Sequence, residues 1–136
     1  MEKDGIKPRH CKLRGEVAEL RFMARAADNG LRVIKPWGDS SRYDFVVEQG
    51  GKFLRIQVKS TSSRLGNTYA CHLSRDPRKH YTKEDIDIIA AYIIPRDIWY
   101  IVPVEMTGKS TLVLSPDKDD SKHARYKEAW HLLRGE

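Results

Sequence analysis

The chain has little of what marks secreted, membrane-spanning or disulfide-stabilised proteins. Its 136 residues include only two cysteines, Cys11 and Cys71, which lie far apart in no motif, so we expect reduced thiols. No apolar run approaches the roughly 20 residues that cross a bilayer. Residues 1–5 are charged and lack the apolar stretch of a signal peptide. These absences predict a cytoplasmic protein without a membrane partner.

Internal repeats, low-complexity tracts and dividing linkers are also absent from the sequence. The length is therefore that of one domain over residues 1–136, with residues 1–10 expected to form a loose basic arm. The five histidines show no metal-ligand spacing with the cysteines, so we expect no zinc site.

Positive charge is what the sequence has in excess. Lysine and arginine number 25 against 19 acids, which gives a net charge of +6 and permits nucleic-acid binding without establishing it. Arg75, Arg78, Lys79 and His80 lie close together and, with Arg64, would suit a phosphate backbone. The alternative for this stretch is an ordinary solvated loop.

Apolar periodicity and turn residues predict an α/β fold, a mixed β-sheet flanked by helices in the order α-β-β-β-β-β-β-α. A further short strand precedes the last helix. The predicted helices cover 13–29 and 121–134, and the predicted strands cover 31–35, 43–49, 52–60, 67–74, 86–94, 98–104 and 111–114.

The most informative segment is a pair of apolar-rich runs around two glycines at positions 50–51, which predicts a β-hairpin. Counting outward from that turn places Asp44 opposite Gln57. Opposed residues share a face of the sheet, as do residues two apart, so Asp44, Gln57 and Lys59 should project from one side. The other side should be a core face that carries Phe45, Val47, Leu54, Ile56 and Val58.

The first predicted helix should bring carboxylates to the sheet. At 100° per residue, one of its faces holds Leu20, Met23 and Ala27 together with two acids. The acids are Glu16 and Glu19, and a carboxylate on a packed face needs a cation, a metal or a donor. One possibility is a salt bridge to Arg42 or Lys12. The other is that Glu19 reaches the Asp44 site as a metal ligand or water-orienting group.

A helix with Glu, a strand, an Asp and then a strand with Gln-x-Lys resembles the order of the PD-(D/E)xK nuclease superfamily. The segments that carry the resemblance are Gly15-Glu16-Val17-Ala18-Glu19, Pro36-Trp37-Gly38-Asp39, Arg42-Tyr43-Asp44 and Gln57-Val58-Lys59-Ser60. They look like the small homing-endonuclease branch associated with group I introns and, more distantly, like archaeal Holliday-junction resolvases. The resemblance implies a restriction-endonuclease-like fold and metal-dependent hydrolysis of duplex or branched DNA.

The resemblance also implies residue roles. Asp44, the Gln57 side-chain oxygen and the Val58 carbonyl would hold Mg²⁺ or Mn²⁺, which lowers the pKa of a bound water. Lys59 would stabilise developing charge, with Glu19 as the fourth catalytic residue. The alternative for Lys59 is an exposed edge lysine. Accessory roles are expected for Glu16, Ser60, Thr61 and Arg42. Two strand cuts need two sites, so a homodimer or homotetramer is expected.

Two positions depart from the superfamily pattern. Tyr43 stands where the name-giving proline would be, and Gln57 stands where an acid is usual. A glutamine oxygen can ligate a hard cation but adds no charge, so metal affinity should fall. The resemblance implies that this glutamine form occurs in active homing nucleases. The alternatives are a catalytically inactive nucleic-acid-binding module on the same fold, or a structural domain that binds no nucleic acid.

Overall fold

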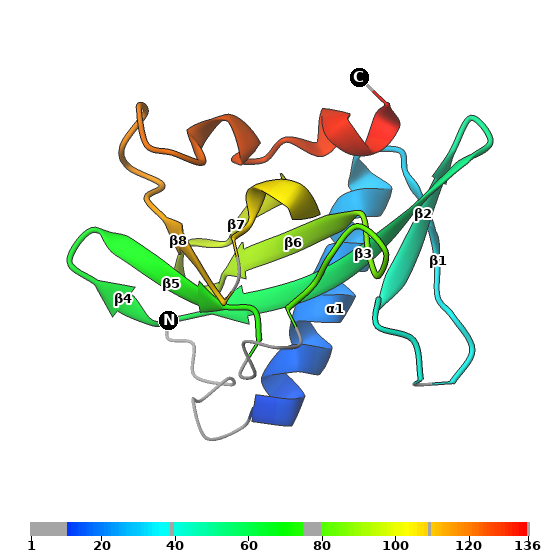
Figure 1. Ribbon diagram of the computed structural model, residues 1–136, viewed down its shortest axis with the longest axis horizontal. Helices are drawn as coiled ribbons and strands as arrows, with labels where there is room; N and C mark the ends of the chain where they lie inside the picture. Colours follow the sequence, from blue (N-terminus) through cyan, green and yellow to red (C-terminus); the bar gives the residue numbers. More distant parts are fainter. Residues whose placement is uncertain (1–10, 39, 75–79, 109, 136) are drawn as a thin grey trace.

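A computed structural model describes residues 11–38, 40–74, 80–108 and 110–135 (Figure 1). One long helix, α1 (Cys11–Asp28), precedes the strands β1 (Arg32–Ile34), β2 (Phe45–Gln49), β3 (Lys52–Thr61), β4 (Arg64–Leu65), β5 (Thr68–His72), β6 (Ile88–Ile93), β7 (Ile98–Pro103) and β8 (Thr111–Leu114). Short 3-10 helices are η2 (Ile94–Arg96), η3 (Val104–Met106), η4 (Ala124–Tyr126) and η5 (Trp130–Arg134). All the expected strands are present within a few residues of their expected ends, and β4 is an additional one.

The strands form two sheets. The larger has the order β1-β2-β3-β6-β7 and is mixed, because β3 and β6 run parallel while its other pairs are antiparallel. The smaller has the order β4-β5-β8. α1 packs on one face of the larger sheet, and β5 and β8 cover the other, which gives two cores (Figure 1). The α/β class with a mixed sheet is thus confirmed. In the part of the chain that is described, no helix is long and apolar enough to cross a membrane.

The hairpin has the predicted register. It runs from the pair Gln49–Lys52 at the turn to the pair Phe45–Ile56. Both turn glycines take positive φ, 58° and 81°, a conformation that glycine adopts without steric cost. The predicted core face is also confirmed: Phe45, Val47, Ile56 and Val58 are buried, and Leu54 is half-buried.

α1 is rotated about its axis relative to the face that periodicity predicts. Met23 of that face packs against the core as expected. The buried residues are Ala18, Phe22 and Ala26, whereas Leu20 is 60% exposed and Ala27 is exposed. The reason is steric. Two alanines, four residues before and after Phe22, let the helix approach the sheet closely enough for that ring to be enclosed.

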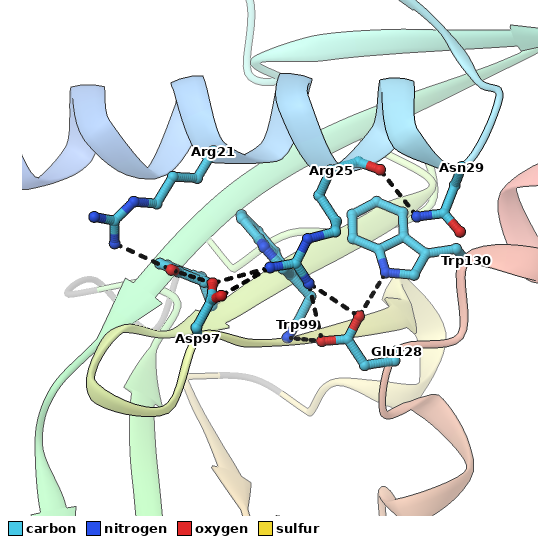
Figure 2. A network of polar contacts seen from close by, with 8 residues as sticks. Arg21, Arg25, Asn29, Asp97, Trp99, Glu128 and Trp130 are labelled. Atoms are coloured by element: carbon cyan, nitrogen blue, oxygen red, sulfur yellow. Dashed lines mark hydrogen bonds and ion pairs between the residues drawn. The ribbon is translucent and has the colours of Figure 1, made fainter.

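The predicted C-terminal helix over 121–134 is wrong, because the chain forms the two short turns η4 and η5 instead. Glu128 lies between them with φ of 50°, which an α-helix cannot contain. Its N–H donates to the Trp99 carbonyl (2.7 Å), and its carboxylate accepts from the Trp99 N–H and from Trp130 Nε1 (2.8 Å each), facing Arg25 of α1 (Figure 2). The segment therefore pairs with the edge of β7, which fixes it between that strand and α1.

Candidate active site

Asp44 is fixed against the middle of β3 by two hydrogen bonds. Its N–H donates to the Ile56 carbonyl, and its Oδ2 accepts from the Val58 N–H, both at 2.8 Å. The carboxylate is thus bonded to Val58, the residue between Gln57 and Lys59 in the sequence. Because the N–H and C=O of a strand residue point to the same side, the Val58 carbonyl faces the edge that Asp44 occupies.

The surroundings of Asp44 disfavour an isolated negative charge. Burial raises the pKa of this carboxyl above its ordinary value, and the hydrogen bond from Val58 lowers it. The neighbouring carboxylate of Glu19 raises it further, whereas Lys35 and Lys59 lower it. The net effect is a rise, so the carboxylate lies in a place that a bound cation would stabilise.

Of the two helix acids, only Glu19 comes near Asp44. Its side chain is 33% exposed, and its Oε1 accepts from Lys35 Nζ at 3.3 Å, so the cation is neither of those expected from the sequence. Glu16 is exposed to solvent, so the expectation that it faces the sheet is wrong. The rotation of α1 that encloses Phe22 carries Glu16 away from the sheet.

Gln57 and Lys59 lie half-buried on one face of β3, alternating with the buried Ile56 and Val58. Their partners on β6 belong to the core between the two sheets. Within the described ranges, no three His, Cys, Asp or Glu side chains are grouped so as to hold a metal ion. The acidic groups at this position are the Asp44 carboxylate and its neighbour Glu19.

A cavity of about 770 Å³ opens beside Lys59. Its lining is basic and rich in hydroxyl groups: Arg14, Arg42, Lys59, Ser60, Thr61, Ser62, Ser63, Ala70, His72, Leu73, Ser74 and Tyr81. Among the expected accessory residues, Arg42 and Ser60 are present here. Thr61 is buried, and its hydroxyl donates to the Ala70 carbonyl at 2.6 Å. Its hydroxyl hydrogen is therefore engaged within the protein and does not point at a phosphate.

The remaining predicted contacts are scattered or undescribed. Arg75, Arg78 and Lys79 lie outside the described residues. His80 is half-buried, and Arg64 is exposed on β4, where its Nε donates to the Gly66 carbonyl at 2.7 Å. Sequence reasoning missed Arg14 and His72 as cavity residues. For Tyr81 the sequence favours packing over stacking on bases, and the packing is confirmed: Tyr81 is half-buried against the core between the two sheets, and it also lines the cavity. In the sequence, Arg14, Arg21 and Arg25 fall on one face of the first helix at 100° per residue, which is the signal that points to Arg14.

A long helix on a mixed sheet, with an Asp fixed beside a strand that carries Gln-x-Lys, defines the nuclease fold of the restriction-endonuclease type. The model of the PD-(D/E)XK endonuclease family matches residues 9–133, and the chain belongs to this family.

Three known proteins are similar to the chain. The bacterial homing endonuclease I-Ssp6803I shares 32% identity with a TM-score of 0.74, over 91% of each chain. The Holliday junction resolvase Hjc of Archaeoglobus fulgidus is 18% identical with a TM-score of 0.52, over 76% of this chain and 85% of its own, and shows the fold alone. Protein 5.3 of Escherichia phage T7 is 27% identical over 103 residues, 74% of this chain and 86% of the phage protein. The two structural neighbours belong to the branches that the sequence resembles.

Proposed function

We propose that the protein is a divalent-metal-dependent DNA endonuclease that hydrolyses phosphodiester bonds. The observation that carries this proposal is the Asp44 carboxylate, which is fixed by the Val58 N–H at 2.8 Å and destabilised by burial beside Glu19. Membership of an endonuclease family supports the reaction class. The similar homing endonuclease supports DNA as the substrate.

The oxygen groups at this position suit a hard cation. Asp44, the Gln57 side-chain oxygen and the Val58 carbonyl would hold Mg²⁺ or Mn²⁺, because such ions take oxygen ligands and keep several waters. When bound, the ion would polarise the scissile phosphate and lower the pKa of a bound water. The partly buried carboxylates of Asp44 and Glu19 support this assignment. Burial and mutual repulsion disfavour the charged form of Asp44, and a bound cation would offset both effects.

The protein's own side chains would do the rest of the work. Lys59 would stabilise the negative charge that develops on the phosphate, and Glu19 would orient the attacking water or hold its proton. Arg14, Arg42 and Ser60 line the cavity next to Lys59 and would bind the DNA backbone there. A symmetric homodimer or homotetramer in the cytoplasm would place one such site on each strand.

Replacement of Lys59 tests the proposal. Lys59→Ala should slow nicking of supercoiled plasmid and of a four-way DNA junction roughly 100- to 1,000-fold, the usual effect of losing one transition-state charge partner. Lys52→Ala, at the exposed start of the same strand, is the matched control and should cut at the wild-type rate. The proposal fails if purified wild-type protein cuts neither substrate with Mg²⁺ or Mn²⁺, or if Lys59→Ala cuts as fast as Lys52→Ala.

Gln57 is the specific feature that favours the second candidate, an inactive nucleic-acid-binding module. Gln57→Glu adds a ligand charge and should lower the Mn²⁺ dissociation constant, measured calorimetrically, about tenfold, because ligand charge tunes cation affinity. Gln49→Glu, exposed on the same hairpin, should leave it unchanged. Salt-sensitive DNA binding without cleavage by the wild type, with cleavage gained in Gln57→Glu, would favour the inactive module. The absence of DNA binding at low salt would favour a structural domain.

A further inference from the structure

The ring of Tyr81 contacts two cations that both line the cavity. The Arg42 guanidinium carbon is 4.4 Å from the ring centroid, and the Lys59 ammonium nitrogen is 5.5 Å from it. All three side chains line the same cavity. Both distances are within the range at which the negative face of an aromatic ring attracts a cation. The ring is therefore a support for Lys59 that comes from outside the hairpin.

The turn that follows Tyr81 is tied to the cation on its ring. Asp85 Oδ2 accepts from the Thr82 N–H at 3.1 Å, which closes the turn, and from Arg42 Nη1 at 2.9 Å. The same guanidinium thus stacks on Tyr81 and pairs with the turn behind it. This double attachment limits how far the ring can move relative to Arg42.

The same turn is anchored to β3 by Arg55. Its guanidinium donates to the Lys83 carbonyl (2.7 Å) and the Glu84 carbonyl (2.9 Å), and its Nε donates to Asp87 at 3.1 Å. Burial alone would raise the pKa of Asp87, but the hydrogen bonds from Arg55 lower it below its ordinary value. β3 therefore carries both Lys59 and Arg55. Arg55, four residues before Lys59, anchors the turn that follows Tyr81, and the Tyr81 ring contacts Lys59.

Lys59 needs such a support because its side chain is flexible. A lysine ammonium ends a four-carbon stem and goes to the nearest favourable partner. Lys59 is half-buried and lines the cavity, where the Tyr81 ring lies 5.5 Å from its ammonium. Without the ring, the stem would let the ammonium take other positions in the cavity.

We propose that Tyr81 is the positioning residue for Lys59, holding its ammonium over the ring at the cavity. This inference rests on the proposed function, in which Lys59 faces the phosphate. Tyr81 acts only by positioning that lysine. Tyr81 itself need not touch the reacting atoms.

The test compares Tyr81→Phe, which keeps the aromatic face, with Tyr81→Leu, which removes it. In the full chain, Tyr81→Leu should lower kcat for DNA cleavage roughly three- to thirtyfold, as expected for loss of the cation–π contact to Lys59. Tyr81→Phe should stay within about twofold of wild type. The NMR signals of the Lys59 ε-methylene protons should be shifted upfield by the ring in wild type and Tyr81→Phe, and should lose that shift in Tyr81→Leu.

The double variant supplies a control against a merely structural effect. In a Lys59→Ala background, Tyr81→Leu should reduce kcat no further if the ring acts through Lys59, since coupled residues are non-additive. An additive loss would overturn the inference, as would equal losses in Tyr81→Phe and Tyr81→Leu or an unchanged Lys59 signal in Tyr81→Leu. Full activity of Lys59→Ala would instead overturn the proposed function, while the NMR comparison would still test the contact.

Discussion

Asp44→Asn is expected to abolish metal-dependent DNA cleavage and at the same time to stabilise the protein at neutral pH. The asparagine oxygen can still accept from the Val58 N–H, so the backbone arrangement is kept. The substitution removes the one charged ligand among the proposed metal-holding groups. Cleavage should therefore fall at least about 1,000-fold, the upper range for losing a single electrostatic contributor. Plasmid nicking measures this loss.

The gain in stability follows from the sign of the pKa shift. Burial raises the pKa of Asp44 in the folded protein, so the stability linked to its protonated form is present below the ordinary pKa and is lost as the pH rises through the folded value. Asp44→Asn should thus have a higher Tm than wild type at pH 7 and an equal Tm near pH 3. Mg²⁺ should raise the Tm of wild type but not of the variant.

Asp117 provides a control because its pKa is shifted in the opposite direction from that of Asp44. Its hydrogen bonds from Arg96 lower its pKa, so Asp117→Asn should not gain stability at pH 7. A lower Tm for Asp44→Asn than for wild type at pH 7 would contradict the assigned electrostatics. Retained cleavage would contradict the proposed role of Asp44.

Phe22→Ala is expected to have the largest effect on stability. The ring is fully buried, and its centroid lies 5.4 Å from Phe45, 5.6 Å from Trp99 and 5.7 Å from Trp130. Removing it leaves a cavity where α1, the sheet and the C-terminal segment meet. The free energy of unfolding in urea should fall by about 3–5 kcal/mol, a large share of the stability of a small domain.

Leu20→Ala is the matched control on the same helix. Leu20 is 60% exposed, so its truncation should change the free energy of unfolding by no more than about 0.5 kcal/mol. The two substitutions together also test the rotation of α1. If the face expected from periodicity were buried, Leu20→Ala would lower the free energy of unfolding more than Phe22→Ala. A larger loss for Leu20→Ala than for Phe22→Ala would show that the sequence-based face was right after all.

Local signals in the sequence predicted the hairpin well. The two glycines fix the turn, and the alternation of apolar residues fixes the register from Gln49–Lys52 to Phe45–Ile56, so these pairs follow from short-range rules. Asp44 lies just before β2, where its N–H bonds to the Ile56 carbonyl. The second glycine signal, Asn29-Gly30, correctly predicts the end of α1, where Gly30 has φ of 76°.

Features that depend on distant segments could not be predicted in this way. The helical spacing of Tyr126, Ala129, Trp130 and Leu133 correctly indicates burial, and all four are buried. It does not reveal that Glu128 takes a positive φ to bond with β7, which replaces an α-helix by two turns. Likewise, the rotation of α1 is set by the rings around Phe22, which come from three other parts of the chain.

The candidate site likewise has one part that local signals predict and another that depends on distant segments. Its hairpin part was predictable, whereas the stack of Arg42 and Lys59 on Tyr81 depends on where Arg55 holds the turn before β6. No local pattern shows that a tyrosine packed against a core also contacts a lysine of another strand. The salt bridge of Glu19 with Lys35 also depends on how β1 lies against the helix.

The parallel pairing of β3 with β6 has a consequence for the order of folding. Asp44 and Val58 belong to one hairpin, and hairpins form within about 1–10 μs. Tyr81 reaches Lys59 only when β6 docks beside β3, which joins Ile56 to Ile88 and must close a much longer loop. We therefore expect the proposed metal ligands to assemble early and the lysine to gain its aromatic neighbour late. A nascent chain would then hold its carboxylate in place before it has a fully arranged catalytic centre.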